Sequence, residues 1–327
     1  MPMHLVSRAS KIYIAGHRGL VGSAIVQRLQ QAGFDNLLLR TRDELDLRIQ
    51  ADVDAFFASK EPDFVVLAAA KVGGILANDQ YPADFISDNL AIQTNVIRAA
   101  HAAQVQRLVF LGSSCIYPKH APQPMKEAHL LTGPLEPTNQ WYAVAKIAGV
   151  KMCQAYRAQH GSDFVSLMPT NLYGPGDNFD LQTSHVLPAL IRKFHEAKGE
   201  GELPDTAVTL WGTGTPRREF LFSDDLADAC LFVFQQPEDT LYDQAPDGML
   251  NVGVGEDIEI RVLAEMIREV IGSTSPIQHD LSKPDGTPRK LMDVSRMQAL
   301  GWQASTSLQE GLQRTYRWFL DHHEVGS

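Results

Sequence analysis

Tyr142 and Lys146 are the side chains of this sequence whose types and spacing best suit proton transfer. They stand four residues apart, and positions i and i+4 lie on the same face of a helix. A nearby ammonium ion favours the phenolate form of a tyrosine, so this pairing predicts a lowered pKa for Tyr142. Such a phenol can give a proton to a carbonyl oxygen, as a nicotinamide-dependent reductase requires. Because a tyrosine and a lysine also meet by chance on ordinary half-buried helices, the interpretation depends on the rest of the chain.

A glycine-rich turn follows the first expected strand, the apolar run at 11–15. The turn reads GxxGxxG, and a helix is expected after it, over 19–33. Glycines let the backbone approach a pyrophosphate closely, and the helix N-terminus offers it unpaired N–H groups. The turn therefore predicts dinucleotide binding. The residues concerned are Gly16, His17, Arg18, Gly19, Leu20, Val21 and Gly22.

The end of the second expected strand, at 36–39, indicates which dinucleotide binds. NAD-binding proteins usually carry an acidic residue at this point, for the ribose hydroxyls. Here the chain continues Arg40-Thr41-Arg42, and an arginine can pair with a 2′-phosphate. Arg42, together with Arg18 in the glycine turn, predicts NADP(H) as the cofactor. Further cofactor candidates are Asp43, Asp46 and Leu47, the last two near the adenine.

Small polar residues follow the fourth expected strand, at 107–111. Ligands of doubly wound folds bind at the carboxyl ends of the strands, so these residues face the nicotinamide site. Either Ser113 or Ser114 can hold a substrate carbonyl together with Tyr142, and Lys146 can reach the nicotinamide ribose. We expect further cofactor contacts at the ends of the fourth and fifth strands, from Leu111, Gly112, Ser113, Ser114, Pro169, Thr170, Asn171 and Leu172.

Strands alternate with helices along the first half of the chain. The runs at 36–39, 63–68, 107–111 and 163–168 predict an α/β protein with a Rossmann-like, doubly wound parallel sheet. After Pro169 glycine and proline become frequent, which predicts a smaller mixed C-terminal substrate lobe. We place the NADP-binding domain at 8–170, with segments around 220–255 returning to it, and the substrate lobe mainly at 171–327. Helices are expected at 263–271 and 308–322, and a surface loop at 235–247.

Composition and charge exclude several classes of protein. The chain has 327 residues, 44% of them hydrophobic, but lacks an apolar run long enough to span a membrane. Its net charge of −10 and the lack of a long basic run argue against a nucleic-acid partner. Its three cysteines have no CxxC spacing, which argues against a disulfide framework or a metal site. The cysteine spacing and the lack of a secretory signal together indicate a cytoplasmic protein.

The order of the glycine turn, Ser113, Tyr142 and Lys146 resembles the extended short-chain dehydrogenase/reductase family. Within it, the chain is most similar to the GDP-L-fucose synthase family. Strings that carry this resemblance lie at 15–19, 68–74, 112–118, 169–175, 184–190 and 282–290. The resemblance implies conversion of GDP-4-keto-6-deoxy-D-mannose to GDP-L-fucose, by epimerisation at C3 and C5 and reduction of the C4 ketone with NADPH.

The same resemblance assigns roles to individual residues. Cys115 and His185 would move the protons of the epimerisation, with the order of the two left open. That assignment suits the chemistry, because the C4 ketone makes the hydrogens on C3 and C5 acidic. His185 would also contact the cofactor. The residues implied for the GDP-sugar substrate are Lys193, Trp211, Arg218 and Asp285. The family commonly has arginine in place of Lys193, and a lysine keeps the positive charge but loses the bidentate geometry.

Two other functions compete with this interpretation. A 4-epimerase or dehydratase of the extended family would reuse bound NAD, which does not suit arginines at the 2′ position. A non-catalytic NADP-binding sensor would typically lack the tyrosine or the lysine, and both are present. The resemblance also implies a homodimer, formed through two helices of each subunit at about 88–103 and 142–159.

Overall fold

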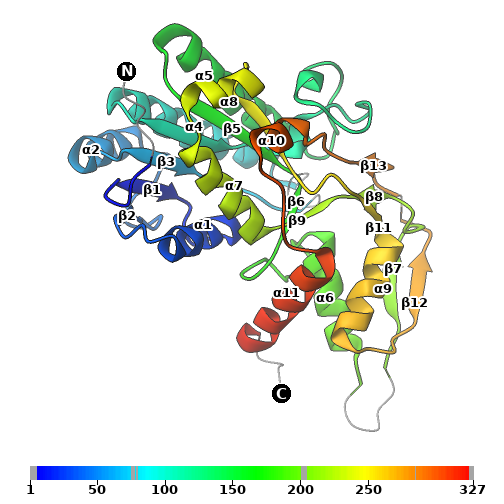
Figure 1. Cartoon of the computed structure of the whole chain (residues 1–327). Helices are drawn as coiled ribbons and strands as arrows, with labels where there is room; N and C mark the ends of the chain where they lie inside the picture. Colours follow the sequence, from blue (N-terminus) through cyan, green and yellow to red (C-terminus); the bar gives the residue numbers. More distant parts are fainter. Residues whose placement is uncertain (1–5, 75–77, 79, 200–204, 284, 324–327) are drawn as a thin grey trace.

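A computed structural model describes residues 6–74, 78, 80–199, 205–283 and 285–323 of the chain. Figure 1 shows the central sheet with helices around it, and a second group of helices and strands beside α6 and α9. None of the helices in these ranges is long and apolar enough to cross a bilayer.

A six-stranded sheet forms the centre of the fold, and all its strands run parallel. This confirms the expected Rossmann-like architecture. The strand order reverses between β1 and β3, which is where ligands bind in doubly wound sheets. In spatial order the strands are β2 (Leu37–Leu38), β1 (Ile12–Ala15), β3 (Phe64–Leu67), β4 (Arg107–Leu111), β5 (Phe164–Pro169) and β10 (Met249–Val252).

Both faces of the sheet are buried, which explains why its strands are apolar at most positions. In β1, Tyr13 and Ala15 enter one core while Ile12 and Ile14 enter the other. The first core is covered by α2 (Gln50–Lys60), α4 (Pro82–Ala102) and α5 (Gln140–His160). The second is covered by α1 (Leu20–Gln31), α7 (Ser223–Gln235), α8 (Glu238–Gln244) and α10 (Ser295–Leu300).

A third apolar core lies in the C-terminal part of the chain. Its helices are α6 (Val186–Ala197), α9 (Ile260–Ile271) and α11 (Leu308–His322), and Figure 1 shows them below the central sheet, on the same side of it as β7 and β12. Short strands complete this region: β6 (Asn171–Tyr173), β7 (Val208–Trp211), β8 (Arg217–Arg218), β9 (Phe220–Phe222), β11 (Ile258–Glu259), β12 (Ile277–Asp280) and β13 (Arg289–Lys290). The division into two domains near residue 170 stays a prediction.

The expected surface loop at 235–247 is wrong, because this segment contains α8. Pro237 precedes the helix, and Glu238 and Asp239 lie in its first turn, where acidic side chains interact favourably with the helix dipole. Leu241 is fully buried in the second core. The Tyr242 hydroxyl donates to Asp163 next to β5, at 3.0 Å. The segment is therefore a packed part of the fold.

Candidate active site

The glycine turn has the geometry that the sequence predicts for close backbone approach. Gly16 has φ +88°, and a Cβ there would lie 2.8 Å from the backbone of Ala69, just beyond β3. A Cβ on Gly22 would lie 2.0 Å from the Gly16 carbonyl oxygen. Only hydrogen fits at either position, so α1 begins tight against the end of β1, at the point where the strand order reverses.

The first turn of α1 is suited to an anion. Gly19 is the N-cap residue and makes no side-chain cap, so its turn leaves N–H groups for a ligand. A Cβ on Gly19 would meet only one atom, at 3.6 Å, so this side of the turn is open. The buried Nδ1 atom of His17 has no hydrogen-bond partner among the described residues. The residues of the turn thus fit the pyrophosphate of a dinucleotide.

His17 marks the point where the glycine turn and the end of β2 meet. Burial lowers the pKa of its imidazole, and the charge of Arg18 lowers it further. Glu44 and the backbone of Arg40, both after β2, act in the opposite direction. The turn and the residues predicted to select the cofactor are therefore neighbours in space.

Arg42 presents its charge to solvent, beside the pair predicted near the adenine. Its side chain is 71% exposed, and its Nε atom lies 4.0 Å from Asp46. Asp46 is held mainly by Arg48, whose Nη2 atom is 2.6 Å away. Leu47 is buried, while Asp43 and Arg18 are exposed. The Arg42 guanidinium is thus available to an incoming phosphate.

Tyr142 and Lys146 lie on the first turns of α5, as the sequence predicts. The Lys146 Nζ atom is 5.8 Å from the centre of the Tyr142 ring and donates to the Leu111 carbonyl oxygen at 2.7 Å. Lys146 is 3% exposed, and burial lowers its pKa to about 7. It has no carboxylate partner among the described residues.

The predicted lowering of the Tyr142 pKa is wrong for the protein without cofactor. Burial raises the pKa of Tyr142, and negative charge on Cys115 adds to the increase. A hydrogen bond from Ser113 acts against it without reversing it. The lysine does not compensate, because its own burial favours the uncharged amine. Tyr142 is therefore a neutral phenol, which can donate a proton or a hydrogen bond.

Ser113 and Cys115 lie at the end of β4, directly in front of Tyr142. Both act on the Tyr142 phenol, which places the three side chains together. The Ser113 hydroxyl also accepts from the Cys115 backbone N–H, at 3.2 Å. Ser114 is buried in the short helix at Ser114–Ile116. Of the two serines that the sequence left open, the geometry favours Ser113 as the hydroxyl that works with Tyr142.

Leu111 and Gly112 bring β4 to this site. Leu111 is buried, and its carbonyl oxygen accepts a hydrogen bond from Lys146. A Cβ on Gly112 would lie 2.6 Å from the Met168 sulfur, so glycine allows β4 and β5 to pack closely here. The chain can then deliver residues from both strand ends to one place.

The segment after β5 is held by a buried glutamate. Thr170 and Asn171 both donate side-chain hydrogen bonds to the Glu219 carbonyl oxygen, at 3.2 and 2.8 Å. The Glu219 carboxylate, which is fully buried, accepts from the backbone N–H groups of Gly255 and Met292. Pro169 and Leu172, which flank this pair, lie at the same strand end. The four residues predicted to contact the cofactor are thereby anchored to the C-terminal region.

His185 precedes α6 directly, at its N-cap position, and makes no side-chain cap. Burial of the imidazole lowers its pKa, although the residue as a whole is exposed to solvent. The loop before it contacts the loop after β3, because Gly74 donates to the Thr183 carbonyl at 3.1 Å. This contact brings the start of α6 to the carboxyl end of the sheet. A neutral imidazole at this place can accept a proton.

The four residues implied for substrate binding form one cluster. The Lys193 Nζ atom lies 5.7 Å from the centre of the exposed Trp211 ring. Asp285 accepts from the backbone N–H and the hydroxyl of Thr213, just after Trp211. The Arg218 Nη1 atom donates to the Thr287 carbonyl at 2.6 Å. Burial lowers the pKa of Lys193 and of Arg218.

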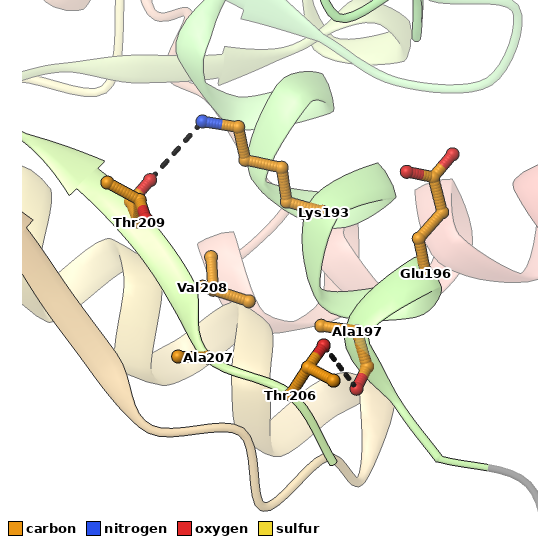
Figure 2. A pocket seen from close by; sticks show the side chains of 7 residues that line it. All are labelled: Lys193, Glu196, Ala197, Thr206, Ala207, Val208 and Thr209. Atoms are coloured by element: carbon orange, nitrogen blue, oxygen red, sulfur yellow. Dashed lines mark hydrogen bonds between the residues drawn. The ribbon is translucent and has the colours of Figure 1, made fainter.

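An open recess of about 300 Å³ lies between α6 and β7, next to this cluster. Figure 2 shows the Lys193 side chain crossing from α6 toward Thr209, whose carbonyl oxygen accepts from Nζ at 3.3 Å. Val208, Ala197 and Glu196 also line the recess. None of the proposed catalytic residues lines it, so we regard it as an extension of the cluster around Lys193.

One residue of the site was missed from the sequence. The Asn139 Nδ2 atom donates to the Cys115 sulfur at 3.3 Å. The two residues are 24 positions apart, so local pattern gave no reason to connect them. The only available signal was that an asparagine directly precedes the helix that carries Tyr142.

Comparisons with known proteins show the family to which the chain belongs. The model of the NAD dependent epimerase/dehydratase family matches residues 12–253. GDP-L-fucose synthase 1 from Arabidopsis thaliana is 58% identical over 313 residues, 96% of this chain and 94% of the relative. The chain belongs to the NAD dependent epimerase/dehydratase family, and within it to the GDP-L-fucose synthase family. The cofactor of this site is therefore a nicotinamide dinucleotide.

Solved structures show the same fold. A GDP-6-OMe-4-keto-L-xylo-heptose reductase from C. jejuni has a TM-score of 0.91 at 39% identity, covering 98% of this chain and all of that one. A GDP-L-fucose synthetase from Naegleria fowleri, determined with NADP bound, has a TM-score of 0.88 at 26% identity and covers 99% of this chain and 96% of that one.

The buried Lys146 predicts an unusual dependence of stability on pH. Its pKa is about 7 in the folded protein and 10.5 unperturbed, so the unfolded state binds more protons between these values. The free energy of unfolding of the wild type should therefore rise relative to Lys146→Met by about 1–4 kcal/mol between about pH 6 and about pH 9. Urea unfolding at both pH values measures this difference. Lys151→Met, an exposed lysine on the same helix, should show no such trend. A pH-independent difference for Lys146→Met would contradict the buried, mostly uncharged lysine.

Proposed function

We propose that the protein converts GDP-4-keto-6-deoxy-D-mannose to GDP-L-fucose, with NADPH as reductant. The observation that carries the proposal is the meeting of Ser113, Cys115 and Tyr142 at the end of β4, on the same edge of the sheet as the glycine turn. The high identity to GDP-L-fucose synthases over nearly the whole chain supports this substrate rather than that of the more distant heptose reductase.

Epimerisation requires one group to remove a proton next to the ketone and another to return one on the opposite face. Cys115 and His185 are the candidates, at the end of β4 and the start of α6. Ser113 and the neutral Tyr142 phenol donate hydrogen bonds to the C4 oxygen while it carries the enolate charge. Hydrogen bonds that strengthen with that charge lower the barrier to proton removal.

The same oxygen site serves the reduction. A bound NADPH supplies the hydride for C4. Tyr142 gives its hydroxyl proton to the C4 oxygen, and its raised pKa keeps that proton in place until the oxygen becomes basic. The Leu111 carbonyl holds the Lys146 amino group in place. From there Lys146 can orient the nicotinamide ribose near Tyr142.

The C-terminal cluster provides the cations for the diphosphate. Arg218 offers a planar fork for phosphate, Lys193 a flexible point charge, and Trp211 a flat apolar face. The Asp285 carboxylate holds the loop after β7 through Thr213, and Trp211 lies beside Lys193. The sugar would then lie between this cluster and the end of β4.

Turnover of the keto sugar tests the proposal directly. We expect the wild type to consume NADPH with GDP-4-keto-6-deoxy-D-mannose and release GDP-L-fucose. Cys115→Ser should lose epimerisation by at least about 100-fold, because a serine hydroxyl is a much weaker base than a thiolate. Loss of NADPH absorbance and chromatography of the products measure both steps. Unepimerised reduced sugar from Cys115→Ser would place Cys115 in proton transfer. Tight NADPH binding without turnover would instead favour another GDP-keto-sugar or a sensor.

The choice of NADPH over NADH should depend on Arg42. Its exposed guanidinium is available for a 2′-phosphate, so Arg42→Ala should weaken NADPH binding about 10–100-fold. Binding of NADH, which has no 2′-phosphate, should change less than about twofold and serves as the internal control. Calorimetric titration of both cofactors measures the ratio. An equal loss for both cofactors would rule out a specific contact with the phosphate.

We also propose a homodimer formed through α4 and α5, which pack side by side over the sheet. The start of α5 exposes Trp141 and Val144, each 41% accessible, and a subunit interface would cover such apolar residues. Light scattering should give twice the monomer mass of 36.1 kDa. A mass near 36.1 kDa at micromolar concentration would contradict the dimer.

A further inference from the structure

Asn139 occupies the N-cap position of α5 without acting as a cap. An asparagine at this position usually accepts a hydrogen bond from the first turn through Oδ1. Here the side chain makes no such bond. Its Nδ2 atom is directed at the Cys115 sulfur instead, at 3.3 Å. The side chain is thus diverted from a common structural role toward the candidate active site.

The oxygen atom of the same amide, Oδ1 of Asn139, is buried and accepts no hydrogen bond from the described residues. Burying an acceptor without a partner costs stability, and native proteins retain few such atoms. Tyr142 lies three residues further along α5, on the side of the helix that faces Cys115. A ligand hydroxyl between these groups would satisfy the free oxygen.

We propose that Asn139 is a positioning residue for the Cys115 thiolate and a contact for the sugar. The Nδ2–H bond stabilises negative charge on sulfur and holds it in one direction. The free Oδ1 atom accepts a hydrogen bond from a ring hydroxyl of the GDP-keto-sugar. The contact with the Cys115 sulfur rests on the geometry alone, while the contact with the sugar rests on the proposed function.

The proton transfer that this arrangement supports is balanced. The thiolate sulfur takes a proton from the carbon next to the ketone and becomes a thiol. The electron pair of the broken C–H bond forms a C=C bond, and the carbonyl π pair moves to the C4 oxygen. Asn139 changes no bond of its own. It stabilises the charged sulfur before the step and fixes the hydroxyl that orients the carbon.

Alkylation by iodoacetamide tests the first half without any substrate. Cys153 and Cys230 are each only 1% exposed, so the half-exposed Cys115 is the site that reacts, which Cys115→Ser verifies. Asn139→Ala should react about tenfold more slowly, because the thiolate loses a charge-assisted hydrogen bond. Asn139→Asp should react more slowly still, because a carboxylate repels the thiolate. Gln140→Ala is the matched control, since this neighbouring side chain bonds the Pro137 carbonyl instead, and it should react at the wild-type rate.

Exchange of the sugar hydrogens with deuterated solvent tests the second half. Asn139→Ala should slow exchange at C3 and C5 and raise KM, while NADPH affinity and the melting temperature stay as in the wild type. Asn139→Asp keeps an acceptor oxygen, so its KM should stay nearer the wild type although its exchange is slow. Wild-type alkylation rates in both variants would overturn the proposal. A wild type inactive on this sugar, together with slowed alkylation, would refute the proposed function and leave the thiolate contact established.

Discussion

The seating of α5 against β4 is the constraint on which the site depends. A Cβ on Gly149 would lie 2.4 Å from the Phe110 ring, so only glycine allows the helix to approach the strand this closely. Gln93 on α4 donates to the Ala145 carbonyl at 2.6 Å, and Lys146 donates to Leu111 at 2.7 Å. These contacts fix both the distance of α5 from the sheet and its rotation about the helix axis. As a result its first turn faces the residues that follow β4.

Burial, rather than charge pairing, controls the chemistry of that first turn. Lys146 has no carboxylate partner in the part of the chain that the structure describes, and burial lowers its pKa to about 7, so a large share of its amine is uncharged at physiological pH. Tyr142 keeps its proton for the same reason. A site of neutral hydrogen-bond donors suits the proposed reaction, in which negative charge develops on one oxygen in both steps. Donors held in place by packing need little reorganisation when that charge forms.

Helix α6 links the two ends of the proposed substrate site. It begins directly after His185, next to the carboxyl end of the sheet, and presents Lys193 beside Trp211 about two turns later. Glu219 provides a second link, because its carbonyl holds Thr170 and Asn171 while the neighbouring Arg218 belongs to the cluster around Lys193. The cofactor and the nucleotide sugar would thus be positioned by connected backbone. A long substrate needs such a link, because misplacement of its nucleotide end would displace the reacting carbon at the other end.

The sequence by itself determined the parallel sheet, the glycine turn and the placing of Tyr142 and Lys146 on one helix. Each of these features depends on residues close together in the chain, with a clear period or spacing. The helix over 238–244 was missed because it is short and its buried leucine packs against residues far away in the chain. The roles proposed for Cys115, His185 and the cluster around Lys193 came from resemblance, since no local pattern joins these residues. Only the tertiary structure decided the protonation of Tyr142 and Lys146 and the contact of Asn139 with Cys115. Both depend on which atoms surround a side chain, and that is set by contacts between strands and helices distant in sequence.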